Sequence, residues 1–163
     1  MAILIDIDGT LANIEHRRYL VEGEKKNWDK FKYEAINDTP NLWCVEIIKG
    51  FITTGSRWQL VFVTGRNENF YLLTTTQIEK WLHLCCNGYK LFMRKEDDFR
   101  SDIEVKEEIY NTKLKQYNFL FAIDDSKEIV NLWRSKGIVT LDCAGYQRTT
   151  TKVVGFNANA KEK

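Results

Sequence analysis

The chain has 163 residues, of which 44% are hydrophobic, and its 24 lysines and arginines nearly balance its 23 acidic residues. This length fits one compact domain, and the apolar content is sufficient for a core, so a disordered chain is excluded. A net charge of +1 excludes a protein that coats long tracts of nucleic acid or a membrane surface, because such binding depends on a large excess of basic side chains.

Short apolar runs alternate with amphipathic patterns along the chain. Strands are predicted over residues 2–7, 59–64, 89–93, 119–123 and 138–141, because continuous apolar runs are typical of strands buried on both faces. Between them, residues 44–52 and 78–85 repeat apolar side chains at helical spacing. Ser101 and Glu104 have the spacing of a capping box, and Ser126 and Gly137 are placed to begin and end a last helix. This alternation predicts an α/β fold in which a doubly wound, Rossmann-like parallel sheet is flanked by helices.

Residues 13–40 interrupt this alternation after the first strand. They are charged and aromatic, with Trp28, Phe31 and Tyr33, and we expect a small, cap-like helical insertion. The five tryptophans of the chain favour packing in the core over a base-stacking platform, and Trp28 is the one whose role in stacking we would test. Residues 1–151 are expected to form a single domain, and residues 152–163, which lack periodicity, a flexible tail.

The sequence shows no evident targeting segment or membrane span. Its apolar start is shorter than a signal peptide, and no stretch approaches the ~20 apolar residues that cross a bilayer, so we expect a soluble, cytoplasmic protein. The four cysteines lack the spacing of metal ligands and are expected to be reduced thiols. A vicinal disulfide between Cys85 and Cys86 is the alternative, which an intracellular compartment disfavours.

Four aspartates follow two of the predicted strands. Asp6 and Asp8 come at the end of the first strand, and Asp124 and Asp125 at the end of the fourth. Ligands bind beyond the carboxyl ends of the strands in such sheets, and four carboxylates gathered there require a positive partner. Because oxygen ligands favour a hard cation, the sequence predicts a Mg²⁺ site, and Mg²⁺ with carboxylates indicates phosphate chemistry.

The same strand ends supply candidate catalytic groups. Asp6 is a candidate nucleophile, since a carboxylate can accept a phosphoryl group, and Asp8 is a candidate general acid and base. Thr64, Arg66 and Lys106 are placed to stabilise the charge of the transferring group.

The run Asp6-Ile7-Asp8-Gly9-Thr10-Leu11 resembles the first motif of the haloacid dehalogenase (HAD) superfamily of phosphohydrolases. Thr64, Lys106 and the pair Asp124-Asp125 are similar to its second, third and fourth motifs. Within the superfamily, the chain more closely resembles the 3′-phosphatase domain of phage polynucleotide kinases, and this resemblance covers nearly the whole chain. Its supporting stretches include residues 63–66, 92–94, 98–102, 105–109 and 122–125.

The resemblance implies a Mg²⁺-dependent enzyme, of phage or bacterial origin, that removes 3′-terminal phosphates from nucleic acid ends or nucleotides through an aspartyl-phosphate. Asp6 would be the nucleophile and Asp8 the general acid and base, while Thr64 and Lys106 would complete the catalytic set. The metal would be held by Asp6, the backbone carbonyl of Asp8, Asp124 and Asp125. The implied substrate-binding residues are Thr10, Arg17, Arg66, Asp102 and, in a segment whose length differs from the family pattern, Asp38.

Two other functions stay open at this point. A nucleotidase or another small-molecule phosphatase would need a pocket closed by residues 13–40. A binding module that recognises phosphorylated ends without turnover is the other alternative, which the intact pair Asp6 and Asp8 disfavours. The sequence lacks the G-x-x-x-x-G-K-[ST] loop, so no kinase activity is expected of this chain.

Overall fold

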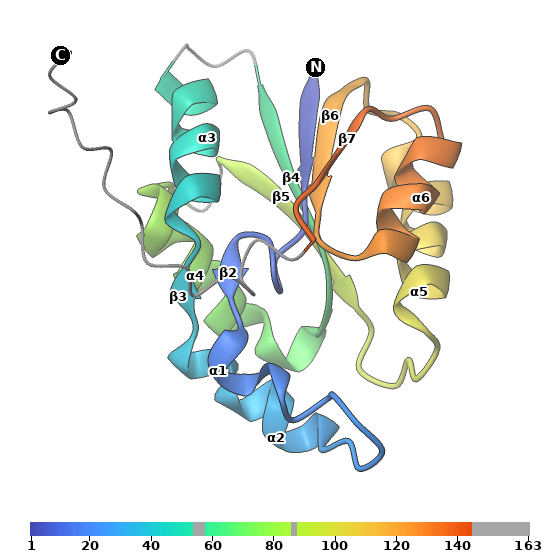
Figure 1. Cartoon of the computed structure of the whole chain (residues 1–163). Coiled ribbons are helices and arrows are strands. Elements are labelled where there is room, and N and C mark those ends of the chain that lie inside the picture. Colours follow the sequence, from blue (N-terminus) through green and yellow to red (C-terminus); the bar gives the residue numbers. More distant parts are fainter. Residues whose placement is uncertain (54–57, 86–87, 145–163) are drawn as a thin grey trace, which may run out of the picture.

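A parallel β-sheet forms the centre of the protein (Figure 1). The computed structural model describes residues 1–53, 58–85 and 88–144. Within them the sheet has the order β5-β4-β1-β6-β7, and every neighbouring pair is parallel. Its strands are β1 (Ala2–Ile5), β4 (Gln59–Asn67), β5 (Tyr89–Arg94), β6 (Phe119–Asp124) and β7 (Thr140–Asp142). The predicted doubly wound α/β fold is therefore confirmed.

The sheet is buried on both faces, which explains why its strands read as continuous apolar runs. Alternate residues of β1 enter different cores: Ile3 and Ile5 pack in one, and Ala2 and Leu4 in the other. Helices α3 (Leu42–Thr53) and α4 (Tyr71–Leu82) cover the first face, and α5 (Asp102–Ile109) and α6 (Lys127–Ser135) the second (Figure 1). A five-residue π-helix, Tyr110–Leu114, continues α5.

Local sequence signals set several helix ends. The capping box of α5 forms as predicted: the Ser101 side chain accepts from the N3 backbone, and the Ser101 backbone N–H donates to Glu104 Oε2 at 2.9 Å. Ser126 stands at the N-cap of α6, but its side chain makes no capping hydrogen bond there. Gly137, with a φ of 80°, follows α6 in the left-handed conformation that suits glycine.

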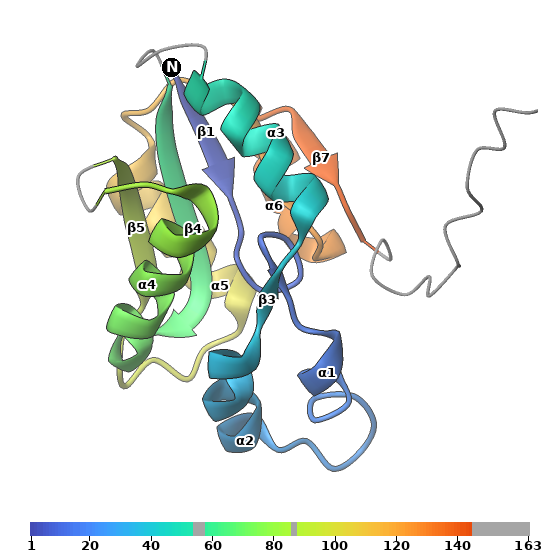
Figure 2. The same cartoon turned by 90° about the vertical axis from the view of Figure 1, so that its left-hand side faces the viewer.

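The segment between β1 and α3 forms short elements beyond the carboxyl ends of the strands (Figures 1 and 2). The two strands β2 and β3 pair antiparallel at its base, so the chain leaves and re-enters the domain at one point. The elements are β2 (Ala12–Asn13), α1 (Glu15–Arg18), α2 (Trp28–Tyr33), the 3-10 helix η1 (Glu34–Asn37) and β3 (Thr39–Pro40).

Some expectations are refined by the structure. The first strand ends at Ile5, two residues earlier than predicted, while β4 continues to Asn67. Cys85 is a free thiol, and Cys86 and the expected tail at residues 152–163 lie outside the described residues. In residues 1–53, 58–85 and 88–144, no helix has both the length and the apolar character that a bilayer crossing requires.

Candidate active site

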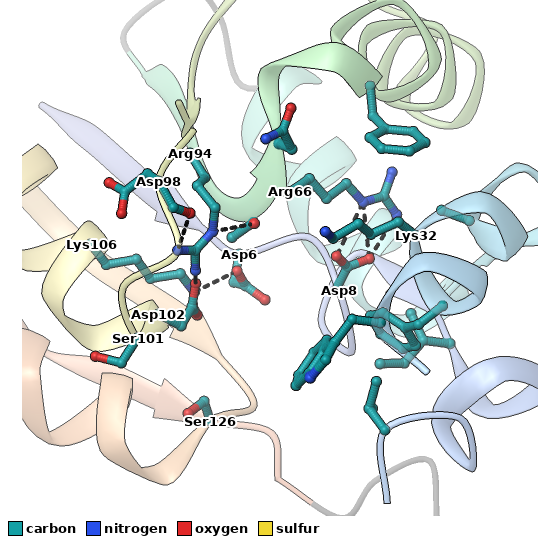
Figure 3. Close-up of a pocket in the computed structure, with 18 of the residues that line it drawn as sticks. Asp6, Asp8, Lys32, Arg66, Arg94, Asp98, Ser101, Asp102, Lys106 and Ser126 are labelled. Atoms are coloured by element: carbon teal, nitrogen blue, oxygen red, sulfur yellow. Dashed lines mark hydrogen bonds and ion pairs between the residues drawn. The ribbon is translucent and has the colours of Figure 1, made fainter. Parts of the chain in front are cut away.

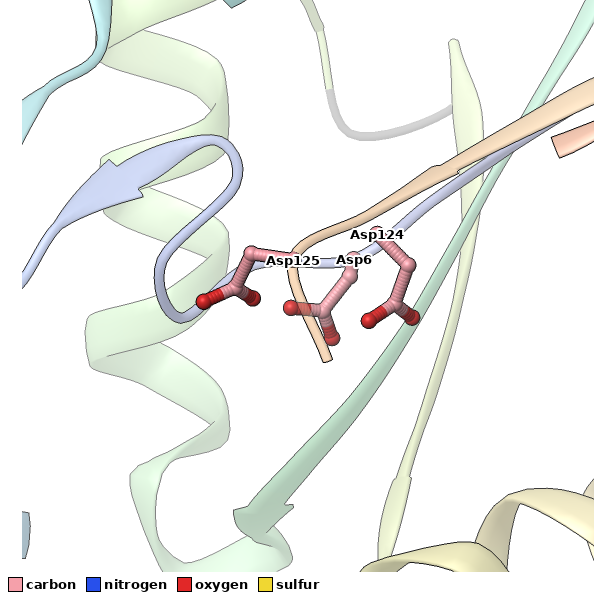
Figure 4. A group of neighbouring side chains, drawn as sticks. All are labelled: Asp6, Asp124 and Asp125. Carbon is pink, nitrogen blue, oxygen red and sulfur yellow. The ribbon is translucent and has the colours of Figure 1, made fainter. Parts of the chain in front are cut away.

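Three carboxylates meet at the carboxyl end of the sheet (Figure 4). Asp6 directly follows β1, and its backbone N–H donates to Ile123 O at 3.1 Å on the neighbouring strand β6. Asp124 ends β6, and Asp125 is the next residue. One carboxylate oxygen from each of the three aspartates lies within 4.8 Å of the others. The pairing of β1 with β6 therefore brings together two motifs that are more than 100 residues apart in the sequence.

Lys106 compensates part of this negative charge. The fully buried ammonium Nζ donates to Asp6 Oδ1 at 2.7 Å and to Asp124 Oδ2 at 3.2 Å, and it lies 3.5 Å from Asp102 Oδ2. Burial lowers the pKa of Lys106, but Asp124 and Asp6 more than offset this effect, so the pKa is raised well above its ordinary value. Lys106 therefore stays protonated on α5 and ties that helix to both strands.

The three carboxylates fit a hard divalent cation. One lysine balances only one of their three negative charges, and burial raises the pKa of Asp6 well above its usual range although Lys106 opposes this rise. Burial and the neighbouring Asp124 also raise the pKa of Asp125, to about 6. A cation with oxygen ligands, such as Mg²⁺, would supply the missing positive charge and return these groups to their ionised form.

Asp124 is oriented by two donors besides Lys106. The indole Nε1 of Trp133 donates to its Oδ2 at 3.3 Å, and the backbone N–H of Ser126 donates to its Oδ1 at 3.0 Å. Such outer contacts fix the direction of a metal-binding carboxylate. The sequence placed Trp133 on the apolar face of the last helix, within a stretch that resembles the family, and did not indicate its contact with Asp124.

The glycine and threonine of the first motif support this cluster. Gly9 has a φ of 93°, and a Cβ atom there would overlap the carboxylate of Asp125. Thr10 is buried, and its Oγ1 lies 3.5 Å from Asp125 Oδ1. Both residues therefore pack against the candidate metal site, although Thr10 was expected to contact the substrate.

The side chain of Asp8 lies apart from that of Asp6 and beside Arg66 (Figure 3). It also forms an ion pair with Arg17. Arg66 donates to Asp8 Oδ1 through Nη2 at 2.7 Å, and Arg17 Nη2 donates to the same oxygen at 2.5 Å. Burial raises the pKa of Asp8, but Arg66 and Arg17 lower it more strongly, to about 2. Asp8 is therefore held ionised. Because its carboxylate faces the arginines, the metal contact predicted for Asp8 would be made by its backbone carbonyl.

Asp38 completes a buried group of four ions. Its Oδ1 accepts from Arg17 Nε at 2.7 Å, and its Oδ2 accepts from Arg17 Nη2 at 2.6 Å and from Arg66 Nη2 at 2.7 Å. Arg17 is only 1% exposed, which is unusual for an arginine and is explained by these carboxylates. With Asp8, the group contains two positive and two negative charges, so it is neutral.

Gln77 links this group to α4 and to the insertion. Its Oε1 accepts from Arg66 Nη1 at 2.6 Å, and its Nε2 donates to the backbone carbonyl of Ala35 at 2.7 Å. Together with the contacts to Asp8 and Asp38, this hydrogen bond fixes the orientation of the Arg66 guanidinium. Sequence reasoning missed Gln77, because a lone glutamine on an amphipathic helix carries no recognisable motif.

The remaining predicted residues lie around the end of β4. Thr64 is buried, and its Oγ1 accepts from the backbone N–H of Arg66 at 3.1 Å. Asp102 is half-exposed at the start of α5 and receives a hydrogen bond from Arg94 Nη2 at 3.3 Å. A Cβ atom at Gly65 would overlap the Asp102 carboxylate, so this glycine allows α5 to approach β4 closely.

A cavity of about 800 Å³ opens above these groups (Figure 3). Its walls come from the insertion, from the end of β4 and from the loop that joins β5 to α5. Eight of the predicted site residues line it, whereas Thr10, Asp38 and Thr64, also among the described residues, do not. The eight are Asp6, Asp8, Arg17, Arg66, Asp102, Lys106, Asp124 and Asp125.

Comparisons with known proteins agree with this geometry. A family model described as the polynucleotide kinase PNKP phosphatase domain matches residues 1–146. A protein of Autographa californica nuclear polyhedrosis virus, named "Putative bifunctional polynucleotide kinase/RNA ligase", is 28% identical over 141 residues, which make up 86% of this chain and 19% of that protein.

Two solved structures share the fold. A chain of "Structure of Pnkp1/Rnl/Hen1 complex" has a TM-score of 0.67 at 23% identity, with 88% of this chain and 45% of that chain covered. A chain of "Structure of the Pnkp1/Rnl/Hen1 RNA repair complex" has a TM-score of 0.71 at 21% identity, with 88% and 42% covered. The chain thus spans about a fifth of the viral relative and less than half of either solved chain.

The family match extends over all the described residues and includes the ends of both strands at which the clustered aspartates lie. The chain belongs to the family of PNKP polynucleotide kinase phosphatase domains, within the HAD superfamily.

Proposed function

We propose that this protein is a Mg²⁺-dependent phosphatase that removes 3′-terminal phosphates from nucleic acid ends through an aspartyl-phosphate. The observation that carries the proposal is the position of Asp6 at the cavity, within reach of two further carboxylates and bonded to Lys106 at 2.7 Å. A carboxylate in this position can act as a nucleophile while a lysine and a cation neutralise the phosphate that it attacks.

In the first step, an oxygen of Asp6 attacks phosphorus, and the bond from phosphorus to the 3′ oxygen breaks. Asp8 gives its proton to the leaving 3′ oxygen. Asp8 then removes a proton from water, which attacks the phosphorus of the acyl phosphate, so that inorganic phosphate leaves and the Asp6 carboxylate is restored. A Mg²⁺ ion held by Asp6, Asp124 and Asp125 would balance the negative charge of the phosphate.

The arginines have two roles in this proposal. Arg17 and Arg66 hold Asp8 ionised in the free protein, yet Asp8 must carry a proton when the leaving oxygen departs. Both arginines are also among the residues that line the cavity, so a substrate phosphate that enters it can compete with Asp8 for them. Substrate binding thereby weakens the contacts that keep Asp8 ionised and prepares it to act as an acid.

A nucleotidase is the second candidate, and one observation favours it. The insertion forms a wall of the cavity, whose volume of about 800 Å³ falls in the range of sites for small ligands. The relatives' names include kinase and ligase, but these words describe proteins several times longer or assemblies, and no kinase activity is proposed for this chain.

The test is phosphate release from a 3′-phosphorylated oligonucleotide, measured beside the 5′-phosphorylated form and the 3′- and 5′-mononucleotides. We expect release from the 3′ end, loss of release after chelation, and recovery with Mg²⁺. Release from mononucleotides alone would establish the second candidate instead.

The matched variant is Asp6→Asn, which keeps the shape of the side chain but cannot form an acyl phosphate. It should abolish turnover of every substrate, while circular dichroism shows a folded protein. Retained turnover would disprove the role of Asp6 as the nucleophile.

A further inference from the structure

Two exposed aromatic side chains stand at the mouth of the cavity. Trp28 is 51% exposed and Phe99 is 90% exposed, and both line the cavity that holds Asp6. Single exposed aromatics are common on protein surfaces. Two that line the same cavity can both contact a ligand that enters it.

The two aromatics come from separate walls. Trp28 begins α2 in the insertion, and Phe99 lies in the loop between β5 and α5. Figure 3 shows Lys32, from the helix of Trp28, and Asp98, from the loop of Phe99, on opposite sides of Asp6. A ligand whose reacting group reaches Asp6 therefore passes between these walls.

The backbone that presents Phe99 is anchored. The guanidinium of Arg94 donates through Nη1 to the carbonyl oxygens on both sides of Phe99, to Asp98 O at 3.2 Å and to Arg100 O at 2.6 Å. Its Nη2 donates to Asp102 Oδ1 at 3.3 Å. Because one side chain fixes the loop at two carbonyls, the backbone that carries Phe99 is ordered before a ligand binds, and binding needs to order only the ring itself.

Trp28 is anchored in a comparable way. Its ring meets the ring of Phe31 edge to face, with the centroids 6.0 Å apart and the planes at 84°. The ring of Phe31 in turn lies 4.1 Å below the guanidinium carbon of Arg17, which binds Asp8. Both exposed aromatics are thus tied, through an arginine, to a residue that lines the site of the proposed reaction.

Aromatic rings bind nucleobases by stacking, and basic side chains beside them suit a phosphate backbone. The ammonium of Lys26 lies 5.7 Å from the centre of the Trp28 ring. Two further basic residues, Lys32 and Arg100, line the cavity. A cavity of about 800 Å³ has room for terminal nucleotides rather than for a base-paired helix.

We propose that Trp28 and Phe99 stack against the bases of an unpaired 3′ end and guide its phosphate to Asp6. This inference rests on the proposed function and adds a substrate class to it: single-stranded 3′ ends are preferred over ends whose terminal base is paired.

The test compares wild type, Trp28→Ala, Phe99→Ala and a control, Leu72→Ala. Leu72 is 77% exposed on α4 and does not line the cavity. Three substrates are used: a single-stranded 3′-phosphorylated oligonucleotide, the same strand with abasic sugars at its last two positions, and 4-nitrophenyl phosphate. Phe99→Tyr and Trp28→Phe serve as conservative variants.

We expect each alanine variant to lower the ratio of kcat/KM on the oligonucleotide to kcat/KM on 4-nitrophenyl phosphate by about 5- to 150-fold, mainly through KM. The conservative variants should keep the wild-type ratio. The abasic strand should be a poor substrate for wild type and no poorer for the alanine variants, because the stacked bases are already missing. Leu72→Ala should match wild type.

Ratios that stay within twofold of wild type would overturn the inference, as would equal rates on a blunt duplex and on a single strand. An equal loss of kcat/KM on 4-nitrophenyl phosphate would also overturn it. The aromatics would then be needed to keep the active site folded and not to bind bases. Failure of the proposed function looks different: wild type would hydrolyse 4-nitrophenyl phosphate but no oligonucleotide 3′-phosphate.

Discussion

Replacing Asp38 by asparagine removes one negative charge from a buried group of four ions. In the wild type, Arg17 and Arg66 share the carboxylates of Asp8 and Asp38, and the charges cancel. The substituted side chain would keep the shape of the original, but only one of its two terminal atoms can accept a hydrogen bond. Its NH₂ group would point either at Arg17 Nε or at the two Nη2 groups that donate to Oδ2 in the wild type. Two buried arginines would then face a single carboxylate.

The cost of this change follows from the burial. Asp38 is buried, and Arg17 and Arg66 are 1% and 6% exposed, so water cannot replace the lost partner. Breaking a buried ion pair from one side costs about 3–5 kcal/mol. At about 2–4 °C per kcal/mol for a chain of this size, Tm should fall by about 6–20 °C.

The assay is thermal and urea unfolding of Asp38→Asn followed by circular dichroism, with Glu46→Gln as control. The Glu46 side chain is 73% exposed and lies 3.9 Å from Lys49, and removal of such a surface ion pair costs about 0–1 kcal/mol. A loss below about 1 kcal/mol in Asp38→Asn, equal to that of the control, would refute the argument that the four ions compensate one another.

Two further predictions concern the first motif. Gly9→Ala and Gly23→Ala both place alanine at a positive φ, 93° and 79°, but only the Cβ at position 9 would overlap a carboxylate of the candidate metal site, that of Asp125. Both variants should lose about 1 kcal/mol or more. The proposed site predicts that Mg²⁺ raises the Tm of wild type and of Gly23→Ala but not that of Gly9→Ala. An undiminished Mg²⁺ response in Gly9→Ala would contradict the packing argument. The second prediction concerns pH. The pKa of Asp8 is lowered from 3.8 to about 2 in the folded state, so ionised Asp8 stabilises the fold above about pH 4. This contribution of about 2 kcal/mol is lost as pH falls toward 2. Acid unfolding of Asp8→Asn should therefore be flatter between pH 4 and 2 than that of wild type, and identical curves would show that the arginines do not depress this pKa.

The strands could be predicted because their burial is directly visible in their residue types. A strand covered by helices on both faces needs apolar residues at every position, and β1 and the centre of β4 have them. The insertion was recognisable only as a break in the pattern. Its short helices and the pairing of β2 with β3 depend on tertiary contacts, and a charged and aromatic segment without periodicity does not predict them.

The site was predictable in part. The motif around Asp6 and the pair Asp124 and Asp125 indicated a carboxylate cluster, and the order β4-β1-β6 brings them together. Arginines are mostly exposed in folded proteins, yet Arg17 is among the most buried large side chains of the described residues. Periodicity cannot show this, because its burial depends on Asp38, 21 residues further along the chain.

The sequence by itself determined which chemistry the protein carries: paired aspartates after an apolar strand, a lysine and a second aspartate pair, in the order of a phosphatase family. Only the tertiary structure decided which of these groups lie at the candidate metal site and which bind the buried arginines. It directs Asp6 toward the candidate metal site and Asp8 toward two arginines, although a single residue separates them. The physical reason is that charge compensation inside a protein is set by which strands and helices are neighbours, and neighbours in space are not neighbours in sequence.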